Sequence, residues 1–145
     1  MIEFLNNFFA PLYENHFDFQ TNKVFLDCVF SNYDYAKFGG VLIMTSFVLL
    51  FIFYKIWDPL KNQRLNWIFI IFIIALTCSI TTYIFLVEFN VSLRMLLKGY
   101  NGSGTDPLSF VFIISLISFF LGLIASIILS IPLSLLSSYN RYNPF

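Results

Sequence analysis

The longest uncharged stretch of the chain, residues 108–136, constrains the fold more than any other feature. Its 29 residues include no Asp, Glu, Lys, Arg or His. A helix of that length is about 43 Å long, whereas the hydrocarbon core of a bilayer is roughly 30 Å thick. We therefore expect a membrane-spanning helix that tilts, kinks or projects beyond the bilayer, with Pro132 as the kink site.

A small residue returns at every fourth position within this stretch. These residues, which we call the small-residue row, are Ser118, Gly122, Ser126, Ser130 and Ser134, and the spacing continues at Ser138. A helix surface that faces lipid gains nothing from serine hydroxyls, whereas small residues at this spacing allow another helix backbone to come close. The row therefore predicts a surface for helix packing.

The spacing also predicts what the row can contact. Four residues advance about 400° around a helix of 3.6 residues per turn, so the series drifts by roughly 200° between Ser118 and Ser138. One straight face cannot hold it. Either one partner helix crosses it obliquely, or different parts of the row meet different helices. Because the chain has only two other candidate spans, the second option predicts contacts with another protein or another copy.

Two further apolar stretches, residues 38–57 and 67–87, are also long enough to span a bilayer. The chain is 59% hydrophobic and 11% charged, whereas soluble domains are typically about 45–50% apolar and about 25% charged. We therefore predict an all-α integral membrane protein with three transmembrane helices, at about residues 38–57, 67–87 and 108–136. The formal net charge is zero, which argues against nucleic acid as a partner.

We expect a single membrane domain over residues 1–145. Residues 1–37 would form an interfacial N-terminal segment, residues 38–137 the three-helix transmembrane bundle, and residues 138–145 a short tail. Residues 91–98 of the last loop should form a short surface helix, and Asp106 or Thr105 should cap the helix that begins at Pro107.

The N-terminal segment should contain two short helices. In residues 2–13 the apolar positions recur at helical spacing, which predicts an amphipathic helix too short to cross a bilayer. These positions are Ile2, Leu5, Phe8, Phe9 and Leu12. The second helix is expected at about residues 22–33, with Thr21 or Asn22 as its N-cap. Its buried residues should be Phe25, Leu26, Val29 and Phe30.

The basic residues distinguish the two sides of the membrane only weakly. One side would carry Lys55, Lys61, Arg64 and Arg141, and the other Lys23, Lys37, Arg94 and Lys98. The loop with Lys61 and Arg64 holds the tightest basic cluster, and basic residues favour the cytoplasmic side. We therefore place this loop and the C-terminus in the cytoplasm and the N-terminus outside, in a bacterial cytoplasmic membrane.

Glu14, His16 and Asp18 are the residues that most resemble a metal site, because histidine and carboxylates are metal ligands. Their two-residue spacing brings them to one side only in a strand, and this segment reads as a loop or helix end. We favour a solvated patch. The candidate spans carry no charge near their middles, which argues against a carrier of protons or charged substrates. We predict no catalytic, cofactor or metal site, and we do not expect an enzyme.

The second candidate span has a polar cluster near its centre. Thr77 and Thr81 share one helix face, and Cys78 and Thr82 share the next. Hydroxyls in a span usually bond to the preceding carbonyl or to a neighbouring helix. We expect this cluster to dock on the small-residue row.

These features predict a non-catalytic subunit or membrane anchor of a larger assembly, which packs through the small-residue row against other integral membrane proteins or further copies of itself. The alternative is a homo-oligomeric channel or membrane-permeabilising effector. In that case the serines of the third span would line a pore at the axis of the oligomer.

Overall fold

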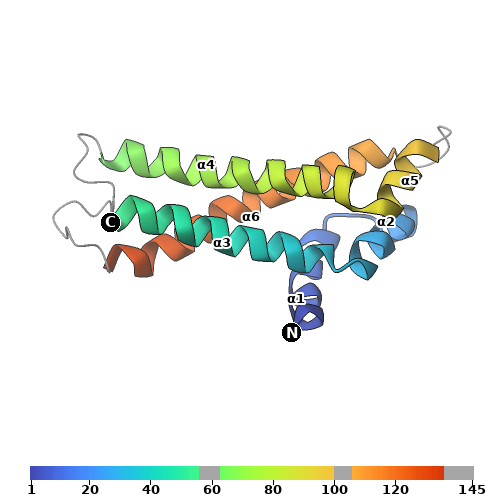
Figure 1. Cartoon of the computed structure of the whole chain (residues 1–145), viewed down its shortest axis with the longest axis horizontal. Helices are drawn as coiled ribbons and strands as arrows, with labels where there is room; N and C mark the ends of the chain where they lie inside the picture. Colours follow the sequence, from blue (N-terminus) through green and yellow to red (C-terminus); the bar gives the residue numbers. More distant parts are fainter. Residues whose placement is uncertain (56–62, 100–105, 136–145) are drawn as a thin grey trace.

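The computed structural model describes residues 1–55, 63–99 and 106–135. The regular elements in these ranges are all helices. In chain order they are α1 (Ile2–Glu14), α2 (Phe19–Ser31), α3 (Asp34–Lys55), α4 (Gln63–Ile84), the π-helix η1 (Phe85–Phe89), α5 (Val91–Gly99) and α6 (Pro107–Leu135). Helices α3, α4 and α6 run along the long axis of the molecule, and α1 stands across it (Figure 1). Helices α2 and α5 lie at the end where α3 begins.

Three helices are long and apolar enough to cross a membrane. They cover Asp34–Lys55, Arg64–Phe89 and Pro107–Ser134. This confirms the prediction of an all-helical fold with three candidate spans. Helix α3 begins four residues before residue 38, and α4 begins four residues before residue 67. The polar first turns continue each helix beyond the apolar stretch, where hydropathy alone does not detect them.

The ends of the remaining helices follow local sequence signals. The carboxylate of Asp106 accepts hydrogen bonds from the Leu108 amide (3.1 Å) and the Ser109 hydroxyl (3.0 Å), so Asp106 caps α6 as predicted. The short surface helix predicted at residues 91–98 is α5. The short tail predicted at residues 138–145 lies outside the described residues.

Helix α2 differs in detail from its prediction. It begins at Phe19, and its N-cap is Asp18, whose carboxylate accepts from the Gln20 amide at 3.2 Å. The cap is therefore neither Thr21 nor Asn22. Leu26 and Val29 are buried, whereas Phe30 is 40% exposed. Helix α2 therefore starts and ends earlier than residues 22–33. Helix α3 begins only three residues after α2 ends, and Tyr33, with a positive φ of 56°, makes this tight turn between them.

The core has two parts. The first lies where α1, α2, α3, η1, α5 and α6 converge, and it is rich in aromatic side chains. Its largest fully buried members include Tyr13, Tyr35 and Phe110. The second part fills the middle of the three long helices with Leu50, Ile74 and neighbouring apolar residues. Many other large apolar side chains of the long helices face outward, which suits a surface in contact with lipid rather than water.

Helix α1 packs on α3 through only part of its predicted apolar face. Its buried residues are Asn6, Phe9, Ala10 and Tyr13. Phe8 and Leu12, which belong to the same apolar face, are 61% and 40% exposed. The Phe9 ring lies directly against Gly39 of α3, where a Cβ atom would collide with it. The missing side chain of Gly39 therefore creates the seat for α1.

Asn6 explains why a polar residue occupies the packed face of α1. Its side-chain amide donates to the Phe30 carbonyl at 3.1 Å and its oxygen accepts from the Ala36 amide at 3.2 Å. These backbone groups belong to the end of α2 and the start of α3, where helices lack internal partners. Asn6 therefore satisfies two helix ends at once and fixes α1 to the junction between α2 and α3.

We expect Gly39→Ala to destabilise the protein and loosen α1. The added Cβ would overlap the Phe9 ring, and overpacking of this kind costs about 1–3 kcal/mol. The matched control is Gly40→Ala, because a Cβ at Gly40 meets nothing within 4 Å and alanine is the better helix former. Thermal melting in detergent should show a lower Tm for Gly39→Ala alone. Equal melting of both variants would contradict this seat for α1.

Candidate functional site

The small-residue row lies inside the bundle of this single chain. Ser118, Ser126, Ser130 and Ser134 are each at most 3% exposed, and Gly122 is also buried. The members contact several different helices, which agrees with the drift of the row around α6. The hydrogen bonds that the structure describes for the row lie within the chain, either with another helix or along α6 itself.

The first member of the row joins three helices. Thr82 of α4 donates a hydrogen bond to the Ser118 hydroxyl at 2.9 Å. The Tyr13 hydroxyl of α1 lies 3.1 Å from the same oxygen. Tyr13 is 1% exposed, and burial raises the pKa of its hydroxyl to about 12 although the bond to Ser118 opposes that shift. Tyr13 is therefore a neutral hydrogen-bonding group at ordinary pH.

The middle of the row is the closest approach of α4 and α6. A Cβ placed on Gly122 would lie 3.1 Å from the Ala75 Cα, so the two backbones are almost in contact. One turn later, the Ser126 hydroxyl donates to the Gly122 carbonyl at 2.6 Å and lies 3.4 Å from the Ser46 hydroxyl of α3. The row therefore turns from α4 toward α3 at this level.

The last part of the row binds both neighbouring spans. Ser130 lies 2.5 Å from the Tyr54 hydroxyl of α3, and it accepts a bond from the Trp67 indole nitrogen of α4 at 2.8 Å. The Ser134 hydroxyl instead donates to the Ile131 carbonyl of its own helix at 2.7 Å. Ser138 lies outside the described residues. Together these bonds form a polar seam along α6 that ties it to α1, α3 and α4.

The polar seam changes the expectation that the drift of the row points toward another chain. That expectation considered only the two other long helices as partners for the row within the chain. The short helix α1 supplies a third partner at Ser118, and α3 and α4 divide the rest of α6 between them. The buried row consequently leaves little surface for a second protein or for the lining of a pore between copies.

Thr77 and Thr81 do not join this seam through their described hydrogen bonds. The Thr77 hydroxyl donates to the Ile73 carbonyl at 2.8 Å, and the Thr81 hydroxyl to the Thr77 carbonyl at 2.7 Å. The adjacent face of α4 makes the contacts, through Thr82 to Ser118 and through Cys78, whose sulfur lies 3.3 Å from the Thr45 hydroxyl. The face with Cys78 and Thr82 lies one residue further along α4, or about 100° around the helix, from the face with Thr77 and Thr81.

We expect Gly122→Leu and Ser126→Leu to unfold or loosen the isolated chain, because both side chains would push α6 away from its own neighbours. Overpacking at the Ala75 contact should cost at least about 1–3 kcal/mol. Ile124→Leu is the control, since Ile124 is 55% exposed. Thermal melting measures the stability of the chain, and size-exclusion chromatography measures its oligomeric state. A lost oligomer with an unchanged Tm would show instead that the row meets another chain.

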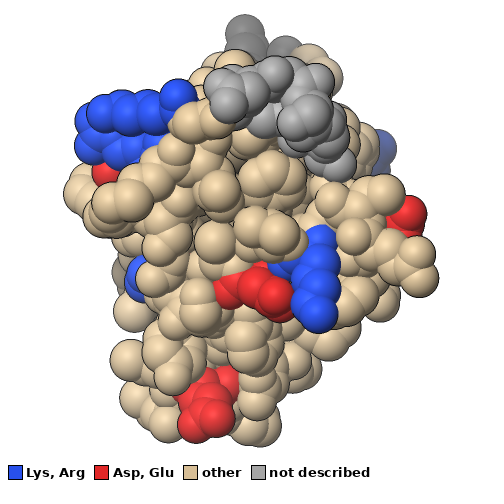
Figure 2. Space-filling model, turned by 90° about the vertical axis from the view of Figure 1, so that its right-hand side faces the viewer, with Lys and Arg blue, Asp and Glu red and all other residues tan. Residues whose placement is uncertain are grey.

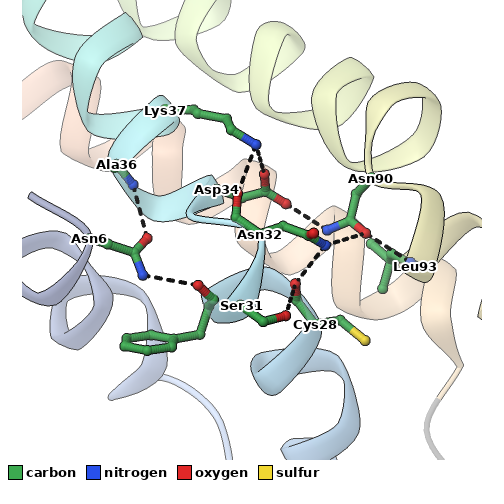
Figure 3. Close-up of polar contacts among 10 residues, drawn as sticks. Asn6, Cys28, Ser31, Asn32, Asp34, Ala36, Lys37, Asn90 and Leu93 are labelled. Carbon is green, nitrogen blue, oxygen red and sulfur yellow. Dashed lines mark hydrogen bonds and ion pairs between the residues drawn. The ribbon is translucent and has the colours of Figure 1, made fainter. Parts of the chain in front are cut away.

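A second polar cluster escaped the sequence analysis. It joins Asn32, Asp34, Lys37 and Asn90, and we call it the polar hub (Figure 3). Asp34 is only 1% exposed. One of its carboxylate oxygens accepts from the Lys37 ammonium at 2.6 Å, and the other from the Asn90 side-chain amide at 2.5 Å. The carboxylate is therefore paired and hydrogen-bonded, as a buried charge must be.

Asn90 connects this carboxylate to two more helices. It follows η1, and its side-chain oxygen accepts from the Leu93 amide at 2.9 Å, which caps α5. The same oxygen accepts from Asn32 at 3.2 Å, and Asn32 also donates to the Cys28 carbonyl at 2.9 Å. The polar hub thus ties the ends of α2, α3, η1 and α5 together on the side where α1 is docked.

The sequence offered one weak signal for the polar hub. Asp34 and Lys37 are spaced to pair on a helix, but the predicted first span began only at residue 38. Asn90 lies 56 positions from Asp34, and no spacing rule links residues so far apart. The contact depends on how the ends of α3 and η1 come together in space.

We expect Asn90→Ala to destabilise the chain by about 1–3 kcal/mol, because it removes the cap of α5 and leaves one oxygen of buried Asp34 without a donor. The control is Ser92→Ala, which changes an exposed residue of the same short helix. Tm in detergent and hydrogen exchange at the α5 amides are the measurements. Equal exchange in the two variants would show that Asn90 does not hold α5.

The group considered as a metal site has other roles in the structure. Asp18 caps α2, and Glu14 is partly buried, which raises the pKa of its carboxyl. Among the residues that the structure describes, no three potential metal ligands lie close enough together to hold an ion.

Comparisons with known proteins do not place the chain in a family. No family model, curated protein or solved structure matches it. Its function therefore has to be argued from its own residues.

Proposed function

We propose that this chain is a multi-pass integral membrane protein that serves, without catalysis, as a subunit or anchor of a larger membrane assembly. Its partners would be other integral membrane proteins or further copies of itself. The observation that carries the proposal is the exterior of the bundle, where large aromatic and aliphatic side chains face outward. Hydroxyls at Ser118, Ser126 and Ser130 bond to neighbouring helices of the same chain, so the spans form one stable body with an apolar exterior.

The N-terminal helix supports the membrane setting of this proposal. Helix α1 stands across the three long helices (Figure 1), so it would lie along the membrane surface if those helices span the bilayer. Its exposed residues include large apolar ones, with Phe4 at 71% and Phe8 at 61% exposed, beside polar ones such as Asn7. Helices with this arrangement rest in the boundary between headgroups and acyl chains.

The partner surface in this proposal is the exterior of the bundle rather than the small-residue row. Outward aromatic and aliphatic side chains cover the long helices, among them Phe47, Phe72 and Phe120. Aromatic residues are enriched at protein interfaces. The end of the molecule that carries α2 and α5 shows acidic and basic side chains scattered among uncharged ones (Figure 2). Neither kind of surface favours a strongly charged partner.

The seam weighs against the pore alternative. A pore lined by the serines of α6 would require Ser126 and Ser130 to face the axis of an oligomer. Both are completely buried and have partners on α3 or α4. Exposing them would break the contacts that hold the bundle together.

Purification of the tagged chain in mild detergent tests the proposed role. We expect other membrane proteins to co-elute with it in a fixed ratio, or the chain to form a defined complex with itself. The control is the same preparation after Gly122→Leu, which should lose the partners together with the fold. A homogeneous oligomer that conducts ions in a planar bilayer would overturn the subunit role.

We also propose that the N-terminus lies outside a bacterial cytoplasmic membrane and the C-terminus inside, on the basis of the Lys61/Arg64 loop. Cysteines introduced as Asn62→Cys and Ser103→Cys should react with a membrane-impermeant maleimide from opposite sides. The native thiols, Cys28 and Cys78, are both free and would first be changed to serine or alanine. Labelling of Asn62→Cys from outside in intact cells would reverse this topology.

A further inference from the structure

Two pockets on the surface of the molecule share helices in their linings. The first, which we call the mouth pocket, has a volume of about 360 Å³ and lies where η1, α5 and the start of α6 meet. Its lining includes Val87, Glu88, Arg94, Lys98, Asp106 and Leu108. The second, the groove pocket, has a volume of about 280 Å³ and lies between α4 and α6. It is lined by Ser79, Ile80, Tyr83, Phe112, Ser115 and Leu116.

Both pockets are lined by α6 together with α4 or its continuation η1. Ser79, Tyr83 and Val87 follow one another at four-residue spacing along α4 and η1. Leu108, Phe112 and Leu116 do the same along the facing side of α6. Eight residues of helix extend about 12 Å, which is close to the depth of one leaflet, about 15 Å. The groove pocket therefore lies farther along the helices than the mouth pocket, within the distance that one acyl chain spans.

The mouth pocket differs from the groove in its charge. Arg94 and Lys98 lie one helical turn apart on α5, and both are exposed. Arg94 makes a long contact of 3.9 Å with Glu88, and both side chains stay at least half exposed. Two basic and two acidic residues therefore line the mouth. This balance fits a headgroup that carries both charges better than a purely anionic one.

The backbone at the mouth is also unusual. The Asn90 amide donates to the Phe85 carbonyl at 3.1 Å, five residues back, and closes the π-helical turn of η1. Such turns are rare and often occur at functional sites. Here the turn ends α4 beside the pocket and presents Glu88 on its exposed side.

We propose that the mouth and groove pockets bind one glycerophospholipid whose headgroup carries a protonated amine. Its phosphate would lie at Arg94 and Lys98, its ammonium group beside Glu88, and one acyl chain between Tyr83 and Phe112. A lysine or arginine close to the membrane surface attracts a lipid phosphate by about 1 kcal/mol. The proposal rests on the insertion of the three spans but not on the proposed subunit role.

Native mass spectrometry of the full chain tests this site. The chain would be titrated in detergent with dioleoyl phosphatidylethanolamine, phosphatidylcholine and phosphatidylglycerol in turn. We expect one bound phosphatidylethanolamine at concentrations where the other two lipids bind weakly. Arg94→Gln and Lys98→Gln should each weaken its binding about fivefold. Lys23→Gln removes an exposed charge from α2 and should leave binding unchanged.

A second pair of variants tests the acyl-chain groove. Ile80→Trp should fill the groove pocket and weaken binding, whereas Ile128→Trp is a matched change at another exposed position of the long helices. The conservative Lys98→Arg should retain binding and guards against loss by misfolding. Equal binding of the three lipids, or equal effects of both Trp variants, would overturn the site.

Glu88→Gln tests the amine of the headgroup separately. It should reduce the preference for phosphatidylethanolamine over phosphatidylcholine to near unity while the charge of the basic residues is kept. A preference that survives this change, or stronger binding of phosphatidylglycerol, would overturn the assignment. Partners that still co-elute with a chain lacking the lipid site would leave the subunit role standing, so the two proposals fail independently.

Discussion

The close approach of α4 and α6 is the constraint on which the rest of the structure depends. Gly122 has no side chain, so the Ala75 backbone can come within reach of it. Hydrogen bonds between helices then become possible on both sides of this point, at Ser118 and at Ser130. Each such bond contributes only about 0.6 kcal/mol on average in a membrane protein. The packing comes first, and the hydroxyls select one register among those that packing allows.

A small residue also permits close packing where α1 meets α3. Gly39 lets the Phe9 ring lie against α3, and Asn6 then bonds to backbone groups at Phe30 and Ala36. A small residue again opens the contact, and polar groups fix it. The polar hub around Asp34 and Asn90 closes this end by joining four helix ends. Helices α1, α2 and α5 are thus parts of the bundle and not independent attachments.

Much of this architecture could be predicted from residue pattern. The lengths of the three spans, the cap at Asp106 and the short helix α5 follow from hydropathy and local signals. The packed face of α1 could not be predicted in this way. Periodicity placed Phe8 and Leu12 on the apolar face of α1 without showing which side packs on α3, and the structure leaves both exposed and buries Asn6. Apolar side chains do not mark the packed face of a helix when lipid, an equally apolar medium, can cover the other faces.

The sequence by itself determined that the chain forms three apolar helices, because a helix satisfies its backbone hydrogen bonds within a single apolar stretch of about 20 residues. It also determined that α6 carries a surface for close packing, because one four-residue series, from Ser118 to Ser134, consists of small residues alone. The tertiary structure decided which helices use that surface. Within the chain the row forms an internal seam, because α1 folds back to Ser118 while α3 and α4 share Ser126 and Ser130. Which helix meets which depends on the crossing geometry, and residue order does not encode that locally.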